Sequence, residues 1–233
     1  MINGYGTVAV AVLRFQGSRM AGRITSLESQ KRSRDRVNVY LEGEFAFGLA
    51  RLVAANLKIG IWLSDEAIAE LTSADGLERA HSRALDYLSY RPRSEAELRD
   101  YLLKKEFPEN AVEEVLARLN RVGLLDDAEF ARYWIDNRAR FRPRGGRMLQ
   151  YELRQKGVAS EAIEEALADY DELAAVRRVA REQARRLRHL PPDKFRRRLY
   201  ARLARRGFSS GLIQEILVAQ DFPQLIDDNS EED

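Results

Sequence analysis

Apolar positions recur with helical spacing three times in the C-terminal two thirds of the chain. In each copy the spacing between six anchor positions is the same, and successive copies are offset by 51 and then by 50 residues. The anchors are Leu98, Leu102, Phe107, Val112, Glu114 and Leu116, then Leu149, Leu153, Val158, Ile163, Glu165 and Leu167, and finally Leu199, Leu203, Phe208, Ile213, Glu215 and Leu217. A repeat of this length is typical of arrays in which each unit buries an apolar face against its neighbours. We therefore expect tandem helical repeats and a function carried by a binding surface.

Helix start and stop signals divide each copy into three helices. Ser94 with Glu97 is a capping-box pattern, in which each side chain bonds the other residue's backbone N–H, and Asp126 with Glu129 repeats it. Gly123 is expected to end the preceding helix, because glycine adopts the left-handed conformation at little cost. We expect the three-helix repeats at residues 80–125, 126–170 and 171–220.

Upstream of the repeats the pattern changes to alternation. Residues 36–41 alternate between polar and apolar side chains, and Glu42-Gly43 is a turn signal before residues 44–47. Residues 24–27 are a candidate third strand, with residues 31–36 as a charged loop between. The sequence therefore predicts a small antiparallel β segment within residues 20–79.

Two short helices are expected after these strands. Residues 51–57 have helical spacing, and Gly60 is expected to end that helix. The polar run at residues 64–66 is expected to cap a second helix that ends at Leu71, with the next helix beginning at about residue 74.

The two ends of the chain differ from its body. Residues 1–19 are expected to form a weakly structured extension, and Met20 is an alternative to Met1 as the true start. Residues 221–233 form a tail with six acids and no base, although the whole chain has a net charge of +2. The remaining chain is basic, which favours a polyanionic partner. The acidic tail either competes for the same surface or only aids solubility.

The composition gives little support for an enzyme. The only histidines, His81 and His189, lie in different repeats, and the chain has no cysteine. A catalytic triad, a disulfide, and a dedicated zinc or iron site are therefore not expected. The sequence contains neither a Walker-type phosphate-binding loop nor a dinucleotide fingerprint. The acidic pair Asp126-Asp127 is assigned to helix capping rather than to acid–base catalysis, and we expect no cofactor.

The sequence also bears on location. No apolar run approaches the roughly 20 residues that a membrane-spanning helix needs. A chain without cysteine fits a reducing compartment. We expect a cytoplasmic protein without a membrane partner.

Arginine clusters are the strongest functional signal. Residues 138–156 hold seven bases against one acid, Glu152, with aromatic residues interleaved, and residues 171–206 hold 13 bases against four acids. Guanidinium groups match phosphate oxygens, and aromatic faces stack on unpaired bases. The candidate contact residues are Arg138, Arg140, Arg142, Arg144, Arg147, Arg154 and Lys156, followed by Arg185, Arg186, Arg196, Arg197 and Arg198.

Part of this pattern has a structural explanation. Arginines on an amphipathic helix often only solvate its outer face. Tyr133 and Trp134 occupy positions that face a core, so we assign them to packing. Residues 138–147 are the better functional candidate, because they are basic and are expected to form a loop made flexible by Gly145-Gly146.

The second copy begins with an eleven-residue segment, GLLDDAEFARY, at residues 123–133. Arg138, Gly145-Gly146 and residues 149–158 follow it, and the first copy has a related segment at residues 87–107. Together these segments resemble the RecX family, the bacterial regulators of the RecA recombinase, over roughly residues 80–220. The matching residues are caps, a glycine stop and core aromatics, so they indicate a scaffold more than a site.

The resemblance implies tandem three-helix repeats in an elongated, curved monomer that lodges in the groove of the RecA–DNA filament. There it would contact RecA and single- or double-stranded DNA, and limit ATP hydrolysis, strand exchange and filament extension in DNA repair, recombination and the SOS response. The β-rich N-terminal segment departs from the most compact, all-helical members. We expect a mainly α-helical, non-enzymatic modulator of RecA. The alternatives are a stand-alone helical-repeat DNA-binding protein and, with less support, an adaptor for an unrelated protein.

Overall fold

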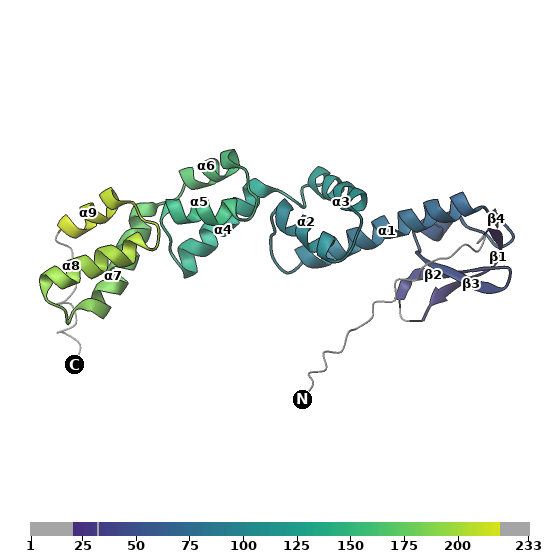
Figure 1. Ribbon diagram of the computed structural model, residues 1–233, viewed down its shortest axis with the longest axis horizontal. Coiled ribbons are helices and arrows are strands. Elements are labelled where there is room, and N and C mark those ends of the chain that lie inside the picture. Colours follow the sequence, from purple (N-terminus) through teal and green to yellow (C-terminus); the bar gives the residue numbers. More distant parts are fainter. Residues whose placement is uncertain (1–20, 32, 220–233) are drawn as a thin grey trace, which may run out of the picture. The chain divides into compact units, whose positions relative to one another are not determined.

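The computed structural model describes residues 21–31 and 33–219, so the predictions for residues 1–19 and for the acidic tail lie outside the described residues. The chain divides into an N-terminal unit that ends at Arg79 and a C-terminal unit that begins at Ala80. Figure 1 shows strands in the first unit and a succession of short helices in the second. Helix α1 (Asp65–Leu88) contributes residues to both.

The N-terminal unit is built on an antiparallel sheet with the strand order β3-β2-β1-β4. The strands are β1 (Gly22–Gln30), β2 (Ser33–Leu41), β3 (Glu44–Ala50) and β4 (Trp62–Leu63). The predicted hairpin is confirmed: Glu42 and Gly43 have φ angles of 50° and 90°, as a two-residue hairpin turn of the I′ type requires. Its two strands pair Val39 with Phe47. Ile24, Val39 and Ile68 belong to the core of this unit.

Two predictions for the N-terminal unit are wrong in detail. The charged loop expected at residues 31–36 is much shorter, because Gln30 pairs with Ser33 and the strands continue to that point. The helix expected at residues 51–57 is a single 3₁₀ turn, η1 (Val53–Asn56).

The helix break expected after Leu71 is also wrong, because α1 continues to Leu88. The hydroxyl of Thr72 donates to the carbonyls of Ile68 and Ala69 within the same helix. Asp75 is buried and accepts hydrogen bonds from the Arg36 guanidinium at 3.1 Å and from the backbone N–H of Ala50 at 2.6 Å. Tertiary contacts with the sheet thus stabilise a helical stretch whose local propensity is weak.

The C-terminal unit contains the predicted three-helix repeats. The second part of α1 forms repeat 1 with α2 (Glu95–Lys104) and α3 (Glu109–Arg121); repeat 2 is α4 (Asp127–Phe141), α5 (Gly146–Arg154) and α6 (Ser160–Ala168); and repeat 3 is α7 (Glu172–Leu187), α8 (Pro192–Ala204) and α9 (Ser210–Val218). The equivalent anchors Leu98, Leu149 and Leu199 have no exposed area. The apolar anchors therefore form the cores of the repeats, as predicted.

The predicted caps are present, with one difference. Ser94 Oγ accepts the backbone N–H of Glu97 at 3.1 Å. Asp126 Oδ1 caps α4 by accepting the N–H groups of Ala128 and Glu129 at 2.8 and 3.0 Å. The carboxylate of Glu97 does not complete the capping box in the expected way, because it accepts hydrogen bonds from arginine and lysine side chains described below. Gly123, with φ of 69°, follows α3 as expected.

One position has a left-handed backbone in all three repeats, directly after the second helix. It is Glu106 in repeat 1, Gly157 in repeat 2 and Gly207 in repeat 3, with φ of 64°, 77° and 87°. A Cβ on Gly157 would lie 2.4 Å from Cβ of Ala96, and one on Gly207 would lie 2.5 Å from Cβ of Met148. Glycine is therefore needed in repeats 2 and 3 both for the backbone angle and for the close approach of the preceding repeat.

Hydrogen bonds to the backbone accompany this close approach. Ser94 Oγ donates to the carbonyl of Lys156 at 2.6 Å. Gly145 is the equivalent of Ser94 in repeat 2, and its N–H donates to the carbonyl of Arg206 at 2.9 Å. The starts of α2 and α5 thus pack on the glycine turns of repeats 2 and 3, respectively.

We predict that Gly207→Ala destabilises the protein more than Gly123→Ala. A left-handed alanine costs roughly 1–2 kcal/mol at either position. Overpacking at Gly207 adds about 1–3 kcal/mol, whereas a Cβ on Gly123 meets nothing within 4 Å. Urea unfolding followed by circular dichroism measures both losses. Equal losses would show that the glycine turn is not a tight contact.

Candidate functional site

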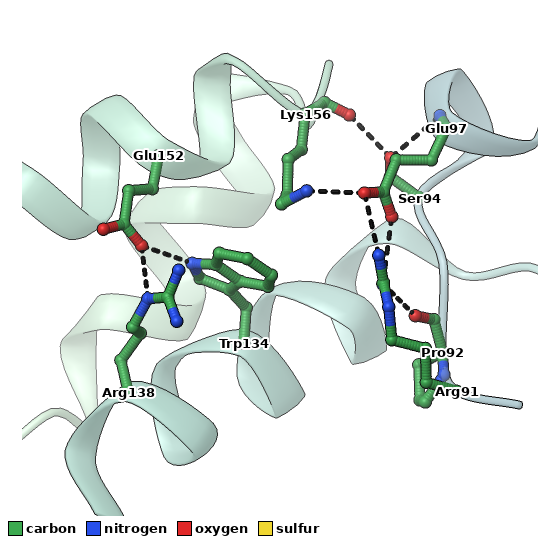
Figure 2. A network of polar contacts seen from close by, with 8 residues as sticks. All are labelled: Arg91, Pro92, Ser94, Glu97, Trp134, Arg138, Glu152 and Lys156. Carbon is green, nitrogen blue, oxygen red and sulfur yellow. Dashed lines mark hydrogen bonds and ion pairs between the residues drawn. The ribbon is translucent and has the colours of Figure 1, made fainter. Parts of the chain in front are cut away.

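The basic residues of repeat 2 are organised around Glu152, the one acid among residues 138–156. Its Oε2 accepts hydrogen bonds from Trp134 Nε1 at 2.9 Å and from Arg138 Nε at 2.6 Å, and its Oε1 lies 3.7 Å from Nε of Arg144 (Figure 2 shows Trp134, Arg138 and Glu152). The Arg138 guanidinium also lies 4.2 Å from the centroid of the Trp134 ring. Arg138 and Arg144 therefore share a single carboxylate within the fold. The assignment of Trp134 to packing is confirmed, because it lies against the core of repeat 2.

Lys156 joins repeat 2 to repeat 1. Its Nζ lies 2.5 Å from Oε1 of Glu97 and 4.5 Å from the centroid of the Trp134 ring. The same carboxylate accepts two hydrogen bonds of 3.1 Å from Arg91 (Figure 2). Burial opposes ionisation of Glu97, but the hydrogen bonds and charges of Arg91 and Lys156 outweigh burial and lower its pKa.

The other arginines of this stretch are exposed. Arg140 and Arg142 lie at the end of α4, and Arg147 and Arg154 lie on α5. Phe141 is 76% exposed and Tyr151 60% exposed. Arg147, Tyr151 and Arg154 have the spacing of one helix face. We call the set the repeat 2 basic face; its members are Arg140, Phe141, Arg142, Arg147, Tyr151 and Arg154.

The prediction of a flexible loop at residues 138–147 is wrong. Helix α4 continues to Phe141 and α5 begins at Gly146. Gly145 is buried, and a Cβ there would lie 2.3 Å from the backbone of Gly207. The N–H of Gly146 donates to Glu172 Oε1 at 3.1 Å. The glycine pair thus permits close packing of repeat 2 on repeat 3 rather than movement.

Tyr170 anchors the same connection from the other side. Its hydroxyl donates to the carbonyl of Arg144 at 2.7 Å. Burial, helped by the charge of Glu172, raises the pKa of Tyr170 to about 12. The phenol therefore stays protonated and remains a donor at neutral pH.

All five predicted contact residues of repeat 3 are exposed. Arg185, Arg186, Arg197 and Arg198 are exposed, and Arg186 forms a 2.8 Å ion pair with Glu182. Arg196 is also exposed, and it donates to the carbonyl of Leu217 at 3.3 Å. Helix α8 carries five bases against one acid. By contrast, α6 has three glutamates and no base, and the only charged residue of α9 is Glu215.

The candidate list omitted Arg202 and Arg205. With Arg198 and Ala201 they line a cavity of 220 Å³ on α8. Arg202 Nη1 donates to Oε1 of Gln183, a buried residue of α7, at 2.7 Å. The helical spacing of the three arginines was visible in the sequence and could have identified them.

A larger cavity of 480 Å³ lies between α4, α6 and the start of α7, and its charged lining residues are Arg132, Asp136, Asp169, Asp171 and Arg178. This mixture of acids and bases includes no histidine, serine or cysteine that could act as a nucleophile beside a base. Among residues 21–31 and 33–219, no group of three or more histidine, cysteine or acidic side chains could hold a metal ion.

The acidic pair Asp126-Asp127 has capping roles, as predicted. Asp126 caps α4, and Asp127 Oδ1 accepts the N–H of Glu95 at 2.9 Å, at the start of α2. Burial raises the pKa of Asp127, and the nearby charge of Glu95 acts in the same direction. Within the part of the chain that the structure describes, no helix is long and apolar enough to span a membrane.

Four domain models of one family match the chain. Residues 22–63 match the regulatory protein RecX N-terminal domain, and residues 80–119, 126–167 and 169–217 match the first, second and third RecX three-helix domains. The chain belongs to the RecX family. The likeness therefore extends beyond residues 80–220 into the β-rich segment, which has its own RecX domain model.

Individual RecX proteins agree with this assignment. The regulatory protein RecX of Bacillus pumilus is 34% identical over 199 residues, covering 83% of this chain and 76% of its own. That of Bacillus subtilis is 34% identical over 195 residues, covering 82% and 74%. A crystal structure of regulatory protein RecX has a TM-score of 0.71 at 31% identity, covering 85% of this chain and 99% of the other.

We predict that Glu97→Gln destabilises the protein by about 1–2 kcal/mol at pH 7, because Arg91 and Lys156 lose their shared anion. Since folding lowers the pKa of Glu97, its contribution is present above the ordinary value of 4.5 and is lost as the pH falls through the lowered value. The difference from wild type should therefore shrink as the pH falls below about 4.5. Urea unfolding between pH 3 and pH 7 measures this.

Glu114→Gln is the control, because Glu114 is exposed and pairs with Arg118 on its own helix. A loss of stability for Glu97→Gln that matches this control at every pH would contradict the inter-repeat role of Glu97.

Proposed function

We propose that this RecX-family protein is a non-enzymatic, cytoplasmic modulator of the RecA recombinase, and mainly an inhibitor. It binds the RecA–DNA filament as a monomer and limits ATP hydrolysis, strand exchange and filament extension in recombination and the SOS response. Family membership supports RecA as the partner. The observation that carries the proposal is the repeat 2 basic face, which exposes four arginines and two aromatic rings within fifteen residues.

The internal ion pairs narrow the set of contact residues. Arg138, Arg144 and Lys156 have carboxylate partners inside the fold, so we assign them to positioning the repeats. The proposed contacts with the filament are Arg140, Arg142, Arg147 and Arg154 in repeat 2 and Arg185, Arg186, Arg196, Arg197 and Arg198 in repeat 3.

The charges of the helices favour DNA contact without base reading. In a three-helix DNA-binding domain of the homeodomain type, the third helix enters the major groove. Here all charged residues of the third helices α6 and α9 are acids, and phosphates repel acidic side chains. The proposed contact bases lie instead on the second helices α5 and α8, at the end of α4 and on α7. Contacts from these elements would be made to phosphates, which position a protein but carry no sequence information.

The exposed aromatic rings favour single-stranded DNA. Phe141 and Tyr151 stand among the arginines of the repeat 2 basic face. Aromatic side chains stack on unpaired bases, and base stacking is worth about 1–3 kcal/mol per base. Backbone contacts from the arginines would apply equally to a duplex, so we propose binding to both forms with a preference for single strands.

We predict that the triple variant Arg140→Ala/Arg142→Ala/Arg147→Ala loses most of its inhibition of RecA. The measurement is the single-stranded-DNA-dependent ATP hydrolysis of RecA from the same organism, titrated at fixed salt. Wild type should inhibit well below one molecule per RecA protomer, and the variant should need at least about tenfold more protein, since each phosphate or carboxylate contact of an arginine is worth roughly 1 kcal/mol or more.

The matched control is Lys31→Ala/Lys58→Ala/Arg83→Ala, which removes three exposed positive charges far from this face in the sequence. Unchanged inhibition by a folded Arg140→Ala/Arg142→Ala/Arg147→Ala variant would refute the surface assignment. Inhibition by wild type only at concentrations that coat the DNA would favour a stand-alone DNA-binding protein.

A second prediction concerns salt. The logarithm of the binding constant for single-stranded DNA falls with the logarithm of the salt concentration, by about 0.7 per phosphate contact. If the three arginines contact phosphates, the triple variant should show a slope that is smaller by roughly 2. Fluorescence anisotropy with a labelled oligonucleotide measures the slope. An unchanged slope together with lost RecA inhibition would mean that these arginines contact RecA rather than DNA.

A further inference from the structure

The repeat architecture leaves one docking position of repeat 3 open. In repeat 1, Glu97 on α2 bonds Lys156 of the next repeat. At the equivalent position of repeat 2, Met148 on α5 packs against Gly207 of the next repeat. The equivalent residue of repeat 3 is Arg198 on α8. Within the described residues, α9 is the last helix, so no following repeat covers this position.

This position is part of the cavity of 220 Å³ described above, which we call the α8 socket. Its lining residues are Arg198, Ala201, Arg202 and Arg205. None of the four is an acid. The position of Arg198 is occupied by Glu97 in repeat 1, and the position of Arg202 is occupied by Glu152 in repeat 2. The docking position of repeat 3 therefore concentrates positive charge, where repeat 1 has Glu97 and repeat 2 has Met148.

One wall of the socket is held in place. Arg202 Nη1 donates to Oε1 of Gln183 at 2.7 Å, and Gln183 is only 5% exposed. A neutral acceptor orients the guanidinium without cancelling its charge, unlike the carboxylates that bind Arg138 and Lys156. The remaining N–H groups of the Arg202 fork stay available for a ligand.

We propose that the α8 socket binds a phosphate group of the nucleic-acid backbone. Three arginine side chains line the cavity and none of its lining residues is an acid; positive charge without a carboxylate suits an oxyanion, and the rigid fork of arginine matches two phosphate oxygens at once. A cavity of 220 Å³ is smaller than the roughly 300–1,000 Å³ of sites for whole small molecules. The chain of phosphates in DNA can present one group to such a site. This inference rests on the DNA contact in the proposed function and adds a defined site to it.

Arg202→Lys tests the socket because it keeps the charge and removes the fork. The control is Arg181→Lys, which makes the same exchange at an exposed arginine of α7 that is neither in the socket nor among the proposed contacts. Anisotropy with a labelled single-stranded oligonucleotide, using the full chain at fixed salt, gives the dissociation constants. We expect about 3- to 10-fold weaker binding for Arg202→Lys and less than about twofold for Arg181→Lys. Equal binding by the two variants, with wild type binding DNA, overturns the socket alone.

Gln183→Leu tests the positioning of Arg202, and a double-mutant cycle separates positioning from a general effect on the fold. We expect Gln183→Leu to weaken DNA binding in the wild-type background and to have little further effect in Arg202→Lys, because the oriented fork is already gone. Thermal unfolding checks that each variant is folded. Additive losses in binding overturn the role of Gln183, and the comparison of Arg202→Lys with Arg181→Lys still tests the site.

Two further arms identify the occupant. Inorganic phosphate should compete with the oligonucleotide more weakly in Arg202→Lys than in wild type; equal competition overturns the socket as a phosphate site. The second arm removes residues 221–233, the acidic tail. If Arg202→Lys binds DNA more tightly than wild type, and the difference disappears without the tail, the tail occupies the socket and the proposal is overturned. A wild-type protein that binds no DNA overturns both the socket and the DNA contact of the proposed function.

Discussion

Stacking of the helical repeats depends on the left-handed turn that follows each second helix. In repeat 2 the turn brings the carbonyl of Lys156 to the start of α2, where Ser94 donates to it. In repeat 3 it brings the carbonyl of Arg206 to the start of α5, where Gly145 donates to it. The approach is so close that Gly157 and Gly207 have no room for a Cβ. Because the same contact recurs at equivalent positions, the path of the chain from repeat 1 to repeat 3 follows from one local geometry used twice.

This stacking also sorts the basic residues into two groups. Glu97 lies where repeats 1 and 2 meet and pairs with Arg91 and Lys156. Glu152 lies where α4 and α5 converge and pairs with Arg138 and Arg144. The arginines beyond their reach, such as Arg140 and Arg147, stay on the surface. The number of bases in the sequence therefore overstates the charge that a partner meets, because Glu97 and Glu152 bind Arg91, Arg138, Arg144 and Lys156 within the fold.

The features that local sequence determines could be predicted, and those set by distant contacts could not. The apolar anchors, the caps at Ser94 and Asp126 and the hairpin turn at Glu42-Gly43 depend on neighbouring residues, and the structure has them. The partner of Lys156 lies 59 residues away, so nothing near Lys156 marks it as an internal cation. Gly145 was mistaken for a source of flexibility for the same reason, since Gly207 is distant in sequence. The hydrogen bond of Arg202 to Gln183 could not be predicted either, because Gln183 lies on another helix.

The two terminal repeats together limit how long such an array can be. Glu106 has an exposed side chain at the position where repeats 2 and 3 need glycine, so a unit inserted before repeat 1 would meet that side chain at its junction. A unit added after repeat 3 would cover Arg198, Arg202 and Arg205, and burying an arginine without an acid beside it costs several kcal/mol. Adding further copies of the repeat at either end would therefore require changes to the side chains of repeat 1 and of repeat 3.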